Sequence, residues 1–220
     1  APQLPPEKPA VAQRACITRD GDLLRVNAGT ISMVMNLNPG LRVESVANLS
    51  GAGLETLVAP GSLFRVLGDG FTMNAEEFVV ERVATERTDQ GEITRIDLRC
   101  DKAPPVVRVS VWVDVTDPRE IGLRASIELN GHDPVKTSFL FPELRGISFG
   151  GRPVESWSWC PRRGDVITAA SVSLREPYAG AGNPLQIIGA FDPLRGTGLY
   201  VMTQDLDARS KFYQAQKTAD

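Results

Sequence analysis

Two carboxylates, Asp205 and Asp207, follow a short apolar run at Leu199–Met202. On a continuing strand they would share one face about 6.5–7 Å apart, near the carboxylate separation of inverting glycoside hydrolases. Arg209 and Lys211 continue the same register, so two acids and two bases would neutralise each other. A turn in which Asp binds its own backbone explains the segment equally simply. We therefore predict a structural role for the pair and no catalytic residue.

The chain has one histidine, His132, within the turn-forming sequence Asn130–Pro134. A single turn histidine is too little for the general acid–base chemistry of a sugar epimerase. The three cysteines, Cys16, Cys100 and Cys160, lie far apart and form no C-x-x-C pair, which disfavours a zinc site. The sequence predicts no metal and no cofactor, and it favours three thiols while leaving one disulfide open.

Aromatic residues are the better candidates for ligand binding. Trp157 and Trp159 are two residues apart and would share one face of a strand. Exposed aromatic rings can stack on the C–H faces of sugars, and the nearby Arg162 could bind hydroxyl or carboxylate groups. We predict a carbohydrate-binding site from Trp157, Trp159, Tyr178 and Arg162, with Trp112 as a further aromatic candidate. The alternative is that one or both of the paired tryptophans fill the core.

Charge and hydropathy exclude other partners. The 220-residue chain carries a net charge of -3 and has a pI near 5.4. Its basic residues are scattered, so we predict no nucleic-acid partner, because phosphate binding needs a concentrated basic surface. No apolar stretch approaches the roughly 20 residues of a membrane span. Residues 1–15 are rich in Pro and Ala, which predicts an extended or disordered lead-in. A start without Met suits an exported chain after signal removal, periplasmic or extracellular.

Short alternating apolar runs separated by turn residues dominate the chain. The clearest covers residues 106–115, where five valines at odd positions share one face. This alternation is typical of an antiparallel sheet with one covered face. Residues 122–130 fit a helix or a strand by periodicity, and the neighbouring strands favour β, whereas residues 210–217 remain open between the two. The pattern predicts an all-β fold, a large two-sheet antiparallel β-sandwich, as one domain over residues 16–220.

Three segments in order resemble a known family. They are LRVESVANLSGAGLETL at 41–57, FPELRGI at 141–147 and FDPLRGTGLYVMTQD at 191–205. Over residues 20–217 the chain resembles the N-terminal supersandwich, or galactose mutarotase-like, domain of glycoside hydrolase-like proteins. That family usually has His where this chain has Gln204. The resemblance implies an accessory domain that precedes a catalytic (β/α)8 barrel beyond the C-terminus.

Three functions follow as hypotheses. The leading one is a non-catalytic accessory domain of a carbohydrate-active protein, which packs beside a catalytic barrel or weakly binds a glycan. The alternatives are a stand-alone sugar epimerase or hydrolase on the same fold, and a structural interaction domain with no sugar role. An enzyme needs acids that converge on one sheet face, and a glycan binder needs Trp157 or Trp159 exposed. A packing domain needs an exposed apolar patch.

Overall fold

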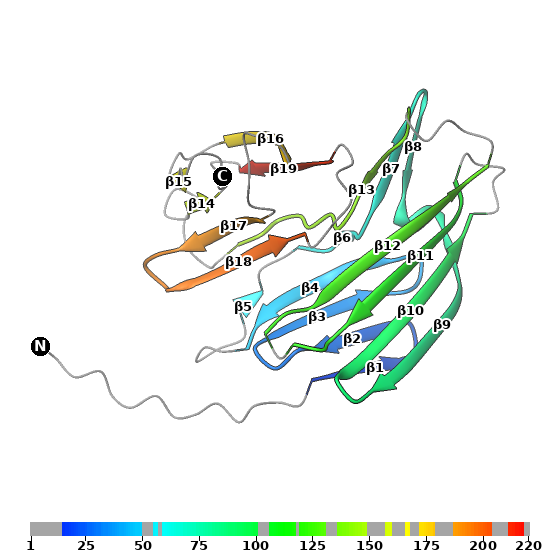
Figure 1. Cartoon of the computed structure of the whole chain (residues 1–220), viewed down its shortest axis with the longest axis horizontal. Helices are drawn as coiled ribbons and strands as arrows, with labels where there is room; N and C mark the ends of the chain where they lie inside the picture. The colour runs from blue at the N-terminus through cyan, green and yellow to red at the C-terminus, as the bar shows by residue number, and fades with distance from the viewer. Residues whose placement is uncertain are drawn as a thin grey trace, which may run out of the picture. The chain divides into compact units, whose positions relative to one another are not determined.

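The protein is an all-β chain of antiparallel strands (Figure 1). The computed structural model describes residues 15–49, 55–56, 59–100, 106–117, 119–130, 136–148, 157–159, 166–167, 172–178, 187–203 and 211–217. Within these ranges there is no α-helix, and η1 (Ala75–Glu77) is a 3-10 turn. The predicted all-β class is therefore confirmed.

Contacts divide the chain into two compact units, Ala1–Ile147 and Ser148–Asp220. The single domain over residues 16–220 stays a prediction. Asp205, Asp207, His132, Arg162 and Cys160 lie outside the described residues. Cys16 and Cys100 are free thiols.

The first sheet of unit 1 follows the chain as a meander. Its strands are β1 (Cys16–Asp20), β2 (Leu23–Asn27), β3 (Ile31–Asn36), β4 (Arg42–Asn48) and β5 (Glu55–Thr56), with β6 (Gly61–Ser62) also pairing with β4. The β3–β4 register shifts between Val34 and Met35, which leaves Glu44 as an extra residue in β4. This bulge resets the alternation, and as a result Val43 and Val46 are both buried although they lie three residues apart.

The second sheet of unit 1 runs in the order β12-β11-β10-β9. Its strands are β9 (Val79–Thr88), β10 (Gly91–Arg99), β11 (Val106–Asp114) and β12 (Gly122–Leu129). Val109, Val111 and Val113 are fully buried, which confirms the predicted valine face. Segment 122–129 is a strand, so the neighbouring β pattern resolved its ambiguous periodicity correctly.

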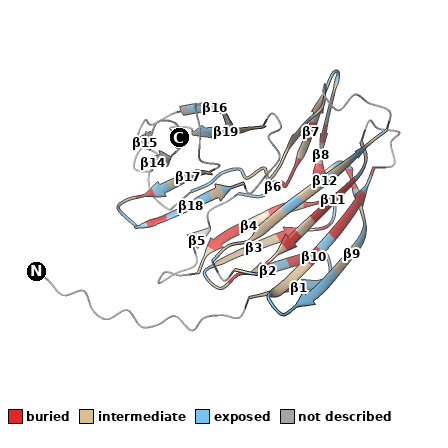
Figure 2. Ribbon diagram, in the orientation of Figure 1, coloured by how far each residue is buried: buried red, intermediate tan, exposed pale blue. Residues whose placement is uncertain are grey.

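The first and second sheets of unit 1 each bury one face, and they contact each other where β1 lies against β10. The Ile17 backbone N–H donates a 2.6 Å hydrogen bond to Glu92 Oε2. The buried faces of β2, β3, β10 and β11 contribute to one apolar core, which Figure 2 shows in red. Two antiparallel sheets with their covered faces on a common core give unit 1 its β-sandwich character.

A third, three-stranded sheet belongs to the same unit. It has the order β13-β7-β8, with β7 (Arg65–Gly68), β8 (Phe71–Asn74) and β13 (Ser138–Leu140). Phe64 precedes β7 and is completely buried. Its ring lies 5.3 Å from the ring of Phe78 and 5.6 Å from that of Phe139, measured between centroids. This aromatic cluster joins the three-stranded sheet to the sandwich core.

Unit 2 contains two small antiparallel sheets. One has the order β15-β14-β17-β18, from β14 (Trp157–Trp159), β15 (Val166–Ile167), β17 (Ile187–Asp192) and β18 (Thr197–Met202). The other pairs β16 (Val172–Tyr178) with β19 (Lys211–Lys217). Residues 211–217 are therefore a strand, which decides between the two predictions left open by the sequence. Within the described ranges, no helix has the length and hydropathy needed to cross a membrane.

Candidate functional site

One face of the β17–β18 hairpin exposes large apolar side chains. Phe191 is 42% exposed, Tyr200 49% and Met202 43%. Antiparallel sheets with one solvated face normally carry polar residues on that face, whereas this one carries two aromatic rings and a thioether. Their neighbours on the opposite face, Ala190 and Val201, are only partly exposed. We call Phe191, Tyr200 and Met202 the aromatic face.

Glycines lie directly opposite the two rings. Phe191 pairs with Gly198, and Tyr200 pairs with Gly189. A Cβ atom at position 198 would lie 3.0 Å from Cδ2 of Phe191, so the Phe191 ring covers the backbone of Gly198. A Cβ atom at position 189 would lie 3.5 Å from Cβ of Tyr200. The Phe191 ring therefore occupies the space above Gly198, and the absence of a side chain at Gly189 keeps the sheet surface low beside Tyr200.

The predicted tryptophans lie in the strand next to this face. The β14–β17 register pairs Trp157 with Phe191 and Trp159 with Gly189, whose other partner is Tyr200. Directly opposite residues of an antiparallel pair lie on the same side of the sheet. The register therefore assigns both tryptophan positions to the side of the aromatic face. Tyr178 belongs to the other sheet of unit 2, where it pairs with Lys211.

A buried carboxylate fixes the turn beside Phe191. Asp192 is only 1% exposed at its side chain and accepts hydrogen bonds from the backbone N–H groups of Leu194 and Arg195, at 2.9 and 3.1 Å. The Arg195 guanidinium adds a 2.7 Å ion pair. Burial by itself would raise the pKa of Asp192, but the hydrogen bonds from Arg195 and Leu194 outweigh it and lower the pKa. Asp192 therefore stays charged and structural, and it holds the hairpin that carries the aromatic face.

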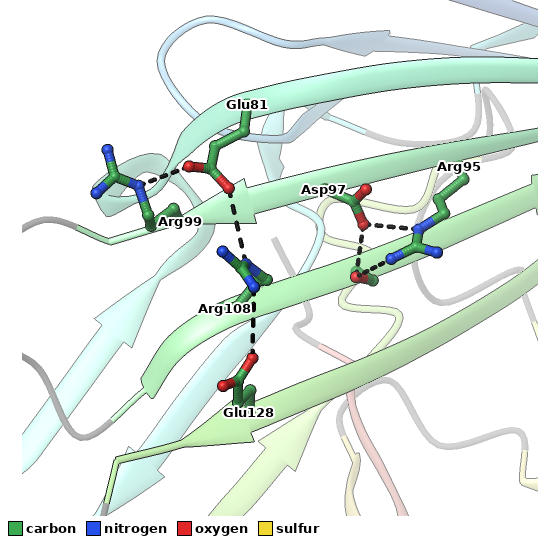
Figure 3. Close-up of polar contacts among 7 residues, drawn as sticks. Glu81, Arg95, Asp97, Arg99, Arg108 and Glu128 are labelled. Carbon is green, nitrogen blue, oxygen red and sulfur yellow. Dashed lines mark hydrogen bonds and ion pairs between the residues drawn. The ribbon is translucent and has the colours of Figure 1, made fainter.

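A separate surface, which is polar, lies in unit 1 on the face of the β9–β12 sheet opposite the buried valines. Figure 3 shows two groups of contacts on this charged face. In one group, Glu81 of β9 pairs with Arg99 at 2.7 Å and with Arg108 at 3.7 Å, and Arg108 reaches Glu128 at 3.8 Å. These side chains are largely solvated, so each pair adds little stability.

The other group centres on Asp97. Its Oδ1 accepts a 2.6 Å hydrogen bond from the Ser110 hydroxyl and a 2.8 Å bond from Nε of Arg95. Burial would raise the pKa of Asp97, but the bonds from Ser110 and Arg95 and the charges of Arg95 and Arg82 together lower it. A carboxylate held in its charged form cannot donate a proton at neutral pH. Asp97 is therefore a charged, hydrogen-bonded carboxylate that links β10 to β11 through Ser110.

This lowered pKa predicts an acid-dependent stability. A carboxyl group whose pKa is lower in the folded state stabilises the fold at pH values above its usual pKa near 4. This stabilisation is lost as the pH falls through the folded-state pKa. We expect Asp97→Asn to cost about 1–2 kcal/mol at pH 7, and the difference from wild type to shrink toward pH 3. Urea unfolding at several pH values measures it. Asp69→Asn, at an exposed turn of the same unit, is the matched control, and a difference that stays constant with pH contradicts the prediction.

The sequence located part of the candidate site. It singled out Trp157 and Trp159, and the register now pairs them with Phe191 and Gly189. It missed Phe191, Tyr200 and Met202, because a run without polar residues at 198–202 reads as a buried strand. The signal that could have found them is the glycine at position 198, since glycine in a strand often marks close approach of another group.

Among the described residues, no group of three or more His, Cys, Asp or Glu is placed to hold a metal ion. No protein-family model, curated protein or solved structure matches this chain.

Proposed function

We propose that this chain is a non-catalytic accessory domain of a carbohydrate-active, glycoside hydrolase-like protein, and that it binds glycan on the aromatic face. The observation that carries the proposal is the pairing of half-exposed Phe191 and Tyr200 with Gly198 and Gly189. Flat rings beside a low floor suit the C–H face of a pyranose, which buries apolar area without needing a deep pocket. Trp157 and Trp159 would extend this surface across β14.

The wider setting belongs to the same proposal. The order of sequence segments favours a galactose mutarotase-like supersandwich in an exported protein with a catalytic barrel as partner. The described carboxylates of the charged face support a non-catalytic role, because Asp97 and Glu81 are occupied by Arg95 and Arg99. A sugar epimerase or hydrolase would need acids that are available to substrate.

The test is a binding measurement on neutral polysaccharides with defined variants. We expect Tyr200→Ala and Phe191→Ala each to weaken binding roughly 5- to 30-fold, which corresponds to about 1–2 kcal/mol of lost stacking area. Affinity electrophoresis against a panel of α- and β-linked glucans, mannans, xylans and galactans identifies the ligand, and isothermal titration gives Kd.

The matched control is Leu194→Ala. Leu194 is 75% exposed in the turn of the same hairpin, so this change removes apolar surface beside the aromatic face without altering it. Binding by Leu194→Ala should equal wild type. Equal binding by all three variants, or no wild-type binding to any polysaccharide of the panel, would overturn the proposal.

A further inference from the structure

Three residues form a row across the charged face of unit 1. The register pairs Arg95 of β10 with Trp112 of β11, and Trp112 with Arg124 of β12. The guanidinium carbon of Arg95 lies 5.2 Å from the centroid of the Trp112 ring, and that of Arg124 lies 4.6 Å from it. Both distances are within the range of cation–π contacts. We call these residues the Arg–Trp–Arg row.

The row carries one unbalanced positive charge, at Arg124. Farther along the strands, Arg99 and Arg108 are neutralised by Glu81 and Glu128. Within the row itself, both charged residues are arginines. Arg95 is balanced by Asp97, which lies 2.8 Å from its Nε, so the unbalanced charge beside the aromatic ring is that of Arg124.

The two arginines differ in how far they are occupied. Arg95 donates from Nε to Asp97 and from one terminal nitrogen to Ser110. Arg124 is exposed, and among the residues that the structure describes no carboxylate lies within ion-pair distance of it. Asp114, two pairs farther toward the hairpin, instead accepts a 3.1 Å hydrogen bond from Thr116, and its carboxylate lies over Gly122.

Stacking on an aromatic ring uses the flat face of a guanidinium and leaves its N–H donors in the plane. Arg has five such donors in a fork that matches the two oxygens of a carboxylate or sulfate. Contact with Trp112 also restricts the Arg124 side chain in advance, so less rotamer freedom is lost when an anion binds. The row thus has the donor geometry, the charge and the preorganisation for an oxyanion.

We propose that the Arg–Trp–Arg row binds the carboxylate or sulfate group of an acidic polysaccharide, with Arg124 as the main ligand and Arg95 as the second. The oxyanion part of this proposal depends on the row alone. The polysaccharide part rests on the proposed function. A carboxylate and a sulfate offer the same acceptor pair, so both sources are tested separately.

The experiment compares polymers that differ only in charge. Polygalacturonate is titrated against its fully methyl-esterified form, and dextran sulfate against dextran, at low and at physiological salt. We expect tighter binding of at least one charged polymer than of its neutral partner, and loss of that difference as salt rises. Arg124→Gln should weaken binding of the charged polymer about tenfold and leave the neutral partner unchanged. The Trp112 indole N–H resonance should shift on titration with the charged polymer.

Two variants separate this site from other effects. Arg99→Gln removes the same charge from the same face about 13 Å farther along β10 and should change acidic-polymer binding less than twofold. Tyr200→Ala should weaken neutral-glycan binding but leave the charge-dependent gain intact. The assignment of the row is overturned if Arg124→Gln still binds the charged polymer as tightly as wild type. It is also overturned if Arg99→Gln weakens that binding as much as Arg124→Gln does.

The outcomes also separate the two proposals. If neutral glycans bind through Tyr200 and charged polymers bind no better, the proposed function stands and the acidic site is wrong. If free sulfate or glucuronate shifts Trp112 through Arg124 while no polysaccharide of either kind binds, the row is an oxyanion site and its polysaccharide ligand is wrong.

Discussion

Replacing Phe64 by alanine is expected to cost about 3–5 kcal/mol of folding free energy. Phe64 is completely buried, and its ring contacts Phe78 edge-on at a 68° interplanar angle. The loss combines apolar burial with a cavity that its neighbours cannot fill, because Phe78 is held at the end of η1 and Phe139 within β13. Since most domains are stable by only about 5–15 kcal/mol, the midpoint of urea unfolding should fall strongly.

The control for this change is Val79→Ala. Val79 is 58% exposed on β9, so the same kind of truncation should alter stability by about 0.5 kcal/mol or less. Circular dichroism during urea unfolding reports both variants. Near-equal midpoints for Phe64→Ala and Val79→Ala would contradict the placement of Phe64 at the centre of the core.

Gly40→Ala is expected to be the second severe change. Gly40 has φ of +63°, which costs an alanine about 1–2 kcal/mol. In addition, the new Cβ would collide with the carbonyl group of Ala75 and lie 2.7 Å from Cα of Glu76. Ala75 donates its N–H to the Phe64 carbonyl at 3.2 Å, so relieving the collision would shift the aromatic cluster. Together these effects should cost about 3–5 kcal/mol.

Gly21→Ala isolates the contribution of the backbone angle. Gly21 has φ of +58°, and a Cβ there would meet nothing within 4 Å. We expect a cost of about 1–2 kcal/mol for Gly21→Ala, measured in the same urea titration. The excess destabilisation of Gly40→Ala then reports the collision with Ala75. Equal costs for the two substitutions would show that η1 can move aside.

Local alternation predicted most of the strands, because one covered face imposes a period of two on the side chains. Residues 106–115 show this most directly, since their valines are buried as expected. Alternation could not predict the bulge at Glu44, because a bulge depends on how two strands pair. It therefore left the position of Val46 unexplained, and the register of β3 with β4 now accounts for it.

The candidate surfaces were harder to predict than the strands. The spacing of Trp157 and Trp159 indicated a shared face, but their neighbours Phe191 and Gly189 come from a strand 30 residues later. Likewise, Arg95 and Arg124 reach Trp112 only because β10 and β12 flank β11 in a particular register. A single sequence carries no direct signal of such pairings. The supersandwich class, the carbohydrate role and the four binding residues named from the sequence stay predictions.

The register shift opposite Asp97 and Leu98 has a consequence for self-association. It leaves Glu81 as the extra residue of β9, and β9 is the last strand in the order of its sheet. A terminal strand offers unpaired backbone groups to a second copy, which can lead to edge-to-edge aggregation. The bulge twists this strand locally, and its charged side chains Glu81, Arg82, Glu86 and Arg87 are exposed. We therefore expect the same glutamate that pairs with Arg99 and Arg108 to disfavour edge-to-edge pairing of β9 with a second copy.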